Sequence, residues 1–289
     1  MKNRRFKKIY LEITNVCNKS CSFCLGTTRE PVFLSIERFE NRIKQIANLC
    51  EKIYLYVGGE PLLHPNIKEF LEIAQKLNVS IAITTNGILI EERFAALLSP
   101  ALREFNVSVH SAQNSNEIEK IVGSALNLAD KRSDLPISFR FWNYQNPQNF
   151  HFQKTIEILQ AKFNGIKITP HTSNGRKKQK ITQNLFVHFD SPFSWDKTAP
   201  VQKKGFCYGL QTHFAILADG RVVPCCLDKN GEIELGNIDE KNVTQILNSP
   251  RTKAIIGGFS QKIMVEKICQ KCAFAQQKFS QKISNKSCL

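Results

Sequence analysis

Cysteine is the residue type that offers the clearest chemistry in this chain of 289 residues, which contains ten of them. Eight fall into two groups, namely Cys17, Cys21 and Cys24, and then Cys207, Cys225, Cys226, Cys269 and Cys272. Disulfides rarely persist in a reducing compartment, where clustered thiols are typical of metal sites. Glu12 interrupts the short apolar run after the basic start, so no signal peptide is indicated, and we expect a cytoplasmic protein. The cysteine groups therefore predict metal binding.

The first group has the spacing C-x3-C-x2-C, with Phe23 directly before the last cysteine. Three thiolates on one loop can hold three corners of an iron–sulfur cube. No fourth Cys or His lies nearby in the sequence. The missing ligand predicts an open coordination position, which is the feature that separates catalytic from structural metal sites. A structural zinc site completed from elsewhere in the chain is the alternative.

This triad, the aromatic residue before its third cysteine and the strand predicted ahead of it resemble the radical S-adenosylmethionine (radical SAM) enzymes. The resemblance extends over nearly the whole chain. It implies a [4Fe-4S] cluster whose open iron is chelated by the amino and carboxylate groups of S-adenosylmethionine. It also implies reductive cleavage of that cofactor to a 5′-deoxyadenosyl radical, which takes a hydrogen atom from a substrate.

The same resemblance assigns cofactor contacts to residues at the ends of predicted strands. The segment Gly58, Gly59, Glu60 and Pro61 matches the GGEP motif, which in the family holds the methionine amino group. Glycines let backbone carbonyls approach a ligand, and a carboxylate suits an ammonium. The further contacts implied are Phe23 beside the adenine, Thr84 and Asn86 near the cofactor, Ser108 and His110 near the ribose, and Arg140 for the methionine carboxylate. A tight turn at the glycines, and ordinary packing for Phe23 and His110, are the alternatives.

The first 170 residues alternate between short β-rich runs and amphipathic helical stretches. Strands are predicted at residues 8–14, 52–57, 79–84, 104–109, 137–142 and 165–169. Helices are predicted at residues 36–49, 67–77, 91–98, 117–131 and 152–163. Such alternation implies a parallel sheet with functional residues at the carboxyl ends of its strands. Six units are too few for a closed barrel, so we predict an α/β partial (β/α)6 TIM-like barrel followed by a small α+β domain; a doubly wound sheet is the alternative.

Local signals refine this organisation. Ser35 is predicted to cap the first helix, Asn66 with Glu69 resembles a capping box, and Cys50 is placed on a helix. Asp219-Gly220 predicts a hairpin between strands at 213–217 and 221–223, with helices at 243–247 and 250–256. The resulting domains are a radical SAM core at 1–171, a bridge at 172–206 and an auxiliary-cluster domain at 207–289.

The second cysteine group resembles the SPASM/Twitch auxiliary domain of many radical SAM enzymes. The resemblance rests on the spacing of Cys207, Gly220 and Cys225 and on the later Cys269-x2-Cys272. Lys278 stands where the SPASM pattern has another cysteine, which favours the shorter Twitch arrangement with one auxiliary [4Fe-4S] cluster. The implied ligands are Cys207, Cys225, Cys269 and Cys272, and full ligation suits electron transfer. Cys226 can replace Cys225 in this set, and structural zinc remains the alternative metal.

The function expected from these features is that of a radical SAM oxidoreductase or modifying enzyme that receives electrons from a flavodoxin or ferredoxin. Its expected substrate is a peptide or protein side chain, or a small alcohol or sugar; the early position of Cys17 leaves little room for a leader-binding segment and weighs against a peptide. No residue is assigned to the substrate chemistry itself. The net charge of +15 keeps two alternatives open, a radical SAM enzyme acting on RNA and a zinc-stapled nucleic-acid-binding protein. No apolar run is long enough for a membrane span.

Overall fold

The computed structural model describes residues 6–24, 26–142, 149–169, 177–190 and 200–276. Within these residues the strands are β1 (Phe6–Leu11), β2 (Cys50–Tyr54), β3 (Ile81–Thr85), β4 (Leu102–Val107), β5 (Ile137–Trp142), β6 (Lys177–Lys180), β7 (Leu185–Asp190), β8 (His213–Ile216), β9 (Arg221–Val223) and β10 (Gly236–Asn237). They form one sheet in the order β10-β9-β8-β1-β2-β3-β4-β5-β7-β6. Strands β1 to β5 run parallel to their neighbours, which confirms the predicted parallel sheet.

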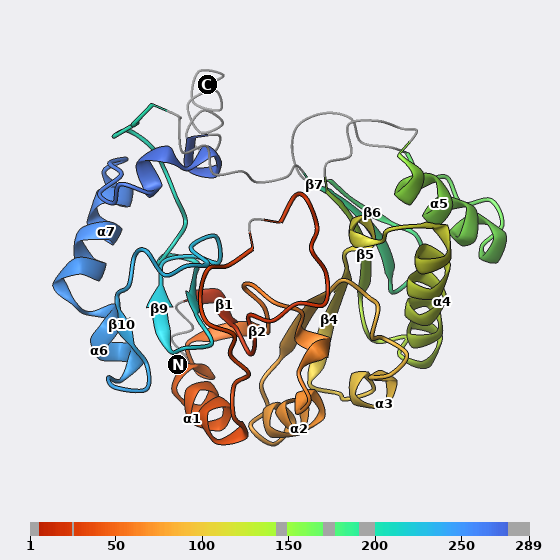
Figure 1. Ribbon diagram of the computed structural model, residues 1–289, viewed down its shortest axis with the longest axis horizontal. Coiled ribbons are helices and arrows are strands. Elements are labelled where there is room, and N and C mark those ends of the chain that lie inside the picture. The colour runs from red at the N-terminus through yellow and green to blue at the C-terminus, as the bar shows by residue number, and fades with distance from the viewer. Residues whose placement is uncertain (1–5, 25, 143–148, 170–176, 191–199, 277–289) are drawn as a thin grey trace.

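Helices connect the parallel strands and cover one side of the sheet. They are α1 (Ile36–Ile46), α2 (Ile67–Lys76), α3 (Phe94–Leu97), α4 (Ser115–Lys131) and α5 (Phe150–Lys162), with α6 (Val243–Leu247) and α7 (Pro250–Ser260) nearer the C-terminus. Figure 1 shows α1 to α5 following one another along the outside of a curved sheet. This arrangement is the predicted partial barrel. None of the helices in the described ranges is both long and apolar enough to cross a bilayer.

The sixth parallel strand does not lie where the sequence predicted it. Residues 165–169 form no strand, and β7 pairs with β5 instead, with Arg140 opposite His188. Residues Ile166 and Ile168 contact the core from an irregular segment, whereas β7 places Leu185, Val187 and Phe189 fully inside it. Three regularly alternating buried side chains bind a strand to a sheet more firmly than two. The segment interpreted as a bridge thus supplies both β7 and its antiparallel neighbour β6.

The local predictions for the first three helices had mixed outcomes. Cys50 begins β2 rather than lying on a helix, because α1 already ends at Ile46. Asn66 makes no side-chain capping hydrogen bond, and the helix predicted at 91–98 shortens to the four residues of α3. Ser35 does cap α1, since its side chain accepts a hydrogen bond from the Arg38 N–H.

The auxiliary hairpin belongs to the same sheet as the barrel. Asp219-Gly220 joins β8 and β9 as predicted, and Gly220 takes a positive φ of 99° that favours glycine. Strand β8 pairs in parallel with β1, so that Tyr10 lies opposite Ala215. The two cysteine groups are therefore carried by one continuous sheet.

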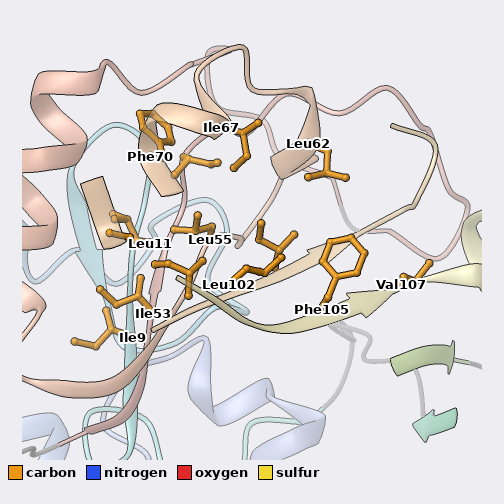
Figure 2. Packing of buried hydrophobic residues seen from close by; sticks show 14 of the residues in the cluster. Ile9, Leu11, Ile53, Leu55, Leu62, Ile67, Phe70, Leu102, Phe105 and Val107 are labelled. Carbon is orange, nitrogen blue, oxygen red and sulfur yellow. The ribbon is translucent and has the colours of Figure 1, made fainter. Parts of the chain in front are cut away.

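The main core lies between the sheet and its helices, as Figure 2 shows for Ile9, Leu11, Ile53, Leu55 and Phe70. A second, smaller cluster occupies the other, inner face and consists of Tyr10, Val57, Ala215, Leu217 and Val223. Because successive side chains of a strand point to opposite faces, Ile9 and Leu11 serve the helical side while Tyr10 serves the inner side. The inner face is the one left to a ligand.

Candidate functional site

The loop that follows β1 carries the first cysteine triad. The Cys24 N–H donates to the Cys21 carbonyl at 2.9 Å, which closes a turn between the second and third thiols. Burial raises the pKa of Cys17 and of Cys21, and the neighbouring Cys24 thiol raises both further. Metal binding requires thiolates, and mutual repulsion of this kind is relieved when a cationic metal centre takes up the charge. The donor set fits an iron–sulfur cluster with three protein ligands.

Backbone packing fixes the GGEP segment against this loop. A Cβ on Gly59 would lie 2.4 Å from the Thr14 carbonyl and 2.7 Å from the Val16 carbonyl. The Glu60 N–H donates to that same Val16 carbonyl at 2.8 Å. Only glycine permits this approach, so the segment after β2 and the triad loop form one rigid unit.

The Glu60 carboxylate is surrounded by protein donors. It accepts hydrogen bonds from the Leu62 N–H at 3.0 Å, the Thr85 hydroxyl at 2.7 Å and the Asn86 N–H at 2.7 Å. Burial raises its pKa and the hydrogen bonds oppose that shift. These contacts connect the end of β2 to the end of β3. The role suggested by the sequence, binding of a ligand ammonium, stays a prediction. Pro61 begins the one-turn helix Pro61–Leu63 that completes the connection.

Asn86 connects the ends of β2 and β3 to the triad loop. Its side-chain amide donates to the Asn18 side chain at 2.8 Å, and it also interacts with the Cys17 thiol. Thr84, in contrast, lies beside the Tyr56 phenol on the inner face, so the contact with Glu60 falls to its neighbour Thr85. Ser108 directly follows β4, and its backbone N–H donates to the Thr85 carbonyl at 2.8 Å.

Three aromatic rings and a guanidinium stand in a row beside the triad. The Phe23 and His110 rings lie 4.9 Å apart, and His110 stacks on Trp142 at 5.7 Å with an interplanar angle of 8°. The Arg140 guanidinium lies 4.4 Å from the Trp142 ring centre. Burial lowers the pKa of His110 to about 3, so the ring is neutral near pH 7. The row offers flat apolar faces for an adenine and a cation for an acid group.

Arg140 is suited to an anionic ligand. It is 8% exposed, and no acidic side chain of the described chain pairs with it. Beside it, the Trp142 indole N–H is buried without a hydrogen-bond partner. Buried cations and polar groups are costly unless paired, so a carboxylate bound here would be strongly favoured. The structure thus brings Phe23, His110 and Arg140 together and adds Trp142, which sequence reasoning missed. Their contacts with the cofactor stay predictions.

The four predicted auxiliary ligands gather beneath the hairpin. Burial raises the pKa of Cys207 to about 11 and that of Cys225 and Cys269 well above its usual range. The thiols raise one another's pKa as well, because Cys207 and Cys272 act on Cys269, and Cys207 and Cys269 act on Cys225. Four mutually repelling thiols, three of them half-buried and Cys272 buried, fit a fully ligated cluster. No three Cys, His, Asp or Glu side chains of the described ranges converge on the position of a single metal ion.

Cys226 points to different neighbours. Burial raises the pKa of its thiol, and the hydrogen bond with the Tyr10 phenol and the charges of Lys8 and Lys229 oppose this shift. Tyr10 belongs to the inner cluster, against which Cys226 also packs. Of the two vicinal cysteines, Cys225 is the one that faces Cys269.

A buried carboxylate that the sequence reasoning used only to exclude a signal peptide lies at the centre of these contacts. Glu12 is fully buried, and its two oxygens accept the Gly58 and Ala218 N–H groups, each at 2.8 Å. Arg29 donates to the same carboxylate. Glu12 therefore joins the GGEP segment, the triad loop and the auxiliary hairpin. Its signal in the sequence was a single charge within the otherwise apolar run from Ile9 to Ile13.

Comparison with sequence families agrees with this geometry. The Radical SAM superfamily matches residues 11–130, and the SPASM family, described as an iron–sulfur cluster-binding domain, matches residues 207–273. The second match contains all four auxiliary cysteines and favours iron over zinc. Curated relatives include GTP 3′,8-cyclases from Aquifex aeolicus (35% identical, over 44% of this chain and 42% of the relative), Psychromonas ingrahamii (27%, over 63% and 61%) and Alkaliphilus oremlandii (23%, over 81% and 84%). The chain thus spans less than two thirds of the first two relatives.

Solved structures share the fold at low identity. BtrN in complex with AdoMet and 2-DOIA is 16% identical with a TM-score of 0.60, and the match covers 93% of each chain. The anSMEcpe structure with bound AdoMet is 15% identical with a TM-score of 0.62 over 92% of this chain and 83% of that one. Streptococcus suis SuiB bound to precursor peptide SuiA is 14% identical with a TM-score of 0.61 over 93% and 70%.

Proposed function

We propose, on the premise that this chain belongs to the radical SAM superfamily and ends in a SPASM-type iron–sulfur domain, that it oxidises a small polar substrate by two electrons. Its cofactors are S-adenosylmethionine and two [4Fe-4S] clusters. When bound, they supply a 5′-deoxyadenosyl radical that takes a hydrogen atom from the substrate, and an auxiliary cluster able to accept the electron that remains. With the release of one proton, the substrate loses two electrons in total.

The residues of the first site would hold the catalytic cluster and its cofactor. Cys17, Cys21 and Cys24 provide the three thiolates, and the rigid GGEP segment lies directly against them. The stacked row of Phe23, His110 and Trp142 offers faces for the adenine, and Arg140 offers a charge for the methionine carboxylate. These half-buried aromatic rings would also shield a reactive radical from water.

The four thiols Cys207, Cys225, Cys269 and Cys272 would ligate the auxiliary cluster fully. A fully ligated cluster has no free iron for a substrate, which suits it to accepting an electron. The β8–β9 hairpin lies next to β1 in the sheet, so this cluster would lie beyond β1, on the side of the sheet where β8 and β9 are. An external flavodoxin or ferredoxin would supply the electron that starts the reaction.

The proposed substrate class rests on the polar side chains of the inner face of the sheet. Glu104 accepts hydrogen bonds from the Tyr54 hydroxyl at 2.9 Å, the Lys52 ammonium at 2.7 Å and the Asn106 amide at 3.0 Å. Tyr10 and Tyr56 lie in the same layer, 5.5 Å apart between ring centres. Hydroxyls, an amide and paired charges recognise a hydroxylated or amino-substituted small molecule better than an apolar side chain.

The comparisons support this reading in part. BtrN, solved in complex with AdoMet and 2-DOIA, matches over nearly the full length of both chains. SuiB, solved bound to its precursor peptide SuiA, extends well beyond the match. A nucleotide is the second candidate, because curated relatives include GTP 3′,8-cyclases and because two lysines, Lys52 and Lys178, lie close together near Glu104 on the inner face.

The test uses the anaerobically reconstituted protein, a chemical reductant and separate panels of amino sugars and cyclitols, nucleoside triphosphates and peptides. We expect one panel member of the first class to raise 5′-deoxyadenosine formation above background, and its deuterated form to transfer deuterium to that product. Cys17→Ala should abolish 5′-deoxyadenosine altogether, while Cys269→Ala should leave cleavage uncoupled from substrate oxidation. Stimulation by peptides alone, or full turnover by Cys269→Ala, would contradict the proposal.

A further inference from the structure

A short segment of the auxiliary domain, residues 228–230, lies against the triad loop. The Arg29 side chain donates to the Lys229 carbonyl at 2.6 Å. The Thr27 hydroxyl and the Thr28 N–H both donate to the Asn230 side chain at 3.1 Å. These contacts join residues about two hundred positions apart in the sequence, so the segment has a fixed position relative to the first cysteine group.

The ammonium of Lys229 reaches one of the triad thiols. Its Nζ lies 3.6 Å from the Cys24 Sγ, within hydrogen-bonding distance for sulfur. The same ammonium also acts on the Cys226 thiol, next to the auxiliary ligand Cys225. Lys229 is therefore a cation between the two cysteine groups, supplied by one domain to the metal site of the other.

The backbone at Lys229 is held in place by a buried acid. The Asp228 carboxylate is 3% exposed and accepts the N–H groups of Glu232 and Ile233, each at 2.8 Å. Together with the Arg29 contact, this turn fixes the point from which the lysine side chain extends. The contact with Cys24 is nevertheless exposed to solvent, so screening will reduce its electrostatic effect.

We propose that Lys229 tunes the catalytic cluster by donating a hydrogen bond to the Cys24 thiolate and so making the cluster easier to reduce. Reduction adds one electron and one negative charge to the cluster, and the proposed step moves no proton. Net charge and hydrogen bonds to the sulfurs are the protein's means of setting cluster potentials. The inference deepens the proposed function, since it rests on Cys24 being a ligand of that cluster.

The experiment is a redox titration of the reconstituted protein, followed by electron paramagnetic resonance without substrate. The signal that changes when S-adenosylmethionine is added belongs to the catalytic cluster. We expect Lys229→Met to lower the equilibrium constant for its one-electron reduction about tenfold, a shift of about 59 mV to lower potential. Lys229→Arg should keep most of the wild-type value, and Lys253→Met, an exposed lysine on α7, should keep all of it.

A second variant separates the effect of the lysine charge from that of its hydrogen bond, and its iron content shows whether the protein still folds and binds its clusters. Lys229→Gln keeps an N–H donor without the charge and should fall between the wild type and Lys229→Met, with the same iron content per chain. Equal midpoint potentials in the wild type and in both the Met and Gln variants would overturn the inference. A wild-type chain with no cluster signal that responds to S-adenosylmethionine would instead contradict the proposed function, so the two failures are distinguishable.

Discussion

Arg29 donates from one guanidinium nitrogen to both carboxylate oxygens of Glu12, at 2.7 and 2.8 Å. The carboxylate is fully buried and the guanidinium side chain is 7% exposed. Burial raises the Glu12 pKa, and Arg29 counteracts this shift. A buried charge pair of this kind contributes modestly as a pair, but removal of one partner leaves the other charge uncompensated.

We therefore expect Arg29→Met to reduce the free energy of unfolding by about 3 kcal/mol or more, because Glu12 would keep a desolvated carboxylate. Chemical denaturation measures the effect. Lys44→Met, which breaks the exposed pair with Glu40, is the control and should change stability by less than about 0.5 kcal/mol. If the two variants lost equal stability, Glu12 would not be the buried centre described above.

Gly59→Ala should damage the first metal site selectively. The added Cβ would overlap two backbone carbonyls, which cannot move aside as flexible side chains can. We expect iron after reconstitution to fall from about eight atoms per chain toward about four, with the auxiliary cluster retained. Gly123→Ala is the matched control on α4, because nothing lies within 4 Å of its Cβ position. That variant should keep all its iron and gain about 0.5 kcal/mol or more of stability.

Arg140→Met should weaken S-adenosylmethionine binding without loss of the cluster. Hydrogen bonds to charged groups contribute about 1.5–3 kcal/mol, so the dissociation constant should rise about 10- to 100-fold. Equilibrium dialysis with the reconstituted protein measures it. Arg103→Met, which removes an exposed arginine paired with Asp134, should bind the cofactor like the wild type. Unchanged affinity in Arg140→Met would remove Arg140 from the cofactor site.

The vicinal cysteines should differ in iron retention. Cys225→Ser should lose the auxiliary cluster, so that iron falls from about eight to about four atoms per chain. Cys226→Ser should keep it, because its side chain faces Tyr10 on the inner side of the sheet. Iron and sulfide analysis of both variants decides the matter. The reverse result would make Cys226 the ligand.

His64 should make the fold sensitive to acid. Asn66 N–H donates to its Nδ1, so Nε2 carries the proton and donates to the Leu34 carbonyl at 3.0 Å. Burial lowers the His64 pKa from 6.5 to about 4. Between these values the unfolded chain binds the proton and the folded chain does not, so stability is complete above about pH 6.5 and declines as the pH falls toward about 4.

The expected loss from this one group is about 3 kcal/mol over that range. His64→Gln replaces the ring with an amide that can still form hydrogen bonds but does not titrate. The stability of this variant should therefore depend less steeply on pH than that of the wild type. Denaturant midpoints at about pH 7 and about pH 5 provide the comparison. An equal change in denaturant midpoint between the two pH values for both proteins would show that His64 does not contribute to the acid sensitivity.

Sequence reasoning predicted the elements that follow strong local patterns. The first five parallel strands, the cap at Ser35 and the hairpin at Asp219-Gly220 all have local causes, namely apolar alternation, a hydroxyl before a helix and a turn dipeptide. The sixth strand was misplaced because residues 165–169 have a strand-like composition but lack enough buried contacts. Composition alone does not reveal which of two competing segments will pair with β5.

The contacts between distant segments were beyond the sequence. Nothing near Glu12 indicates that it meets Ala218, and nothing near Lys229 indicates that it meets Cys24. Such pairs arise only when β8 takes its place beside β1, which is a choice of topology and not of local propensity. The metal ligands could be predicted because their spacing is itself the signal, whereas the residues that position them carry none.

The pairing of β8 with β1 also affects how the chain can reach its native state. Strand β1 leaves the ribosome early, and one of its edges is covered by β2 within about fifty residues. Its other edge is covered only by residues 213–216, which are synthesised much later. Until then an apolar strand presents unpaired backbone groups, a known template for association between chains. We therefore expect β8 to protect the free edge of β1, and a fragment ending before β8 to aggregate rather than fold as an isolated barrel.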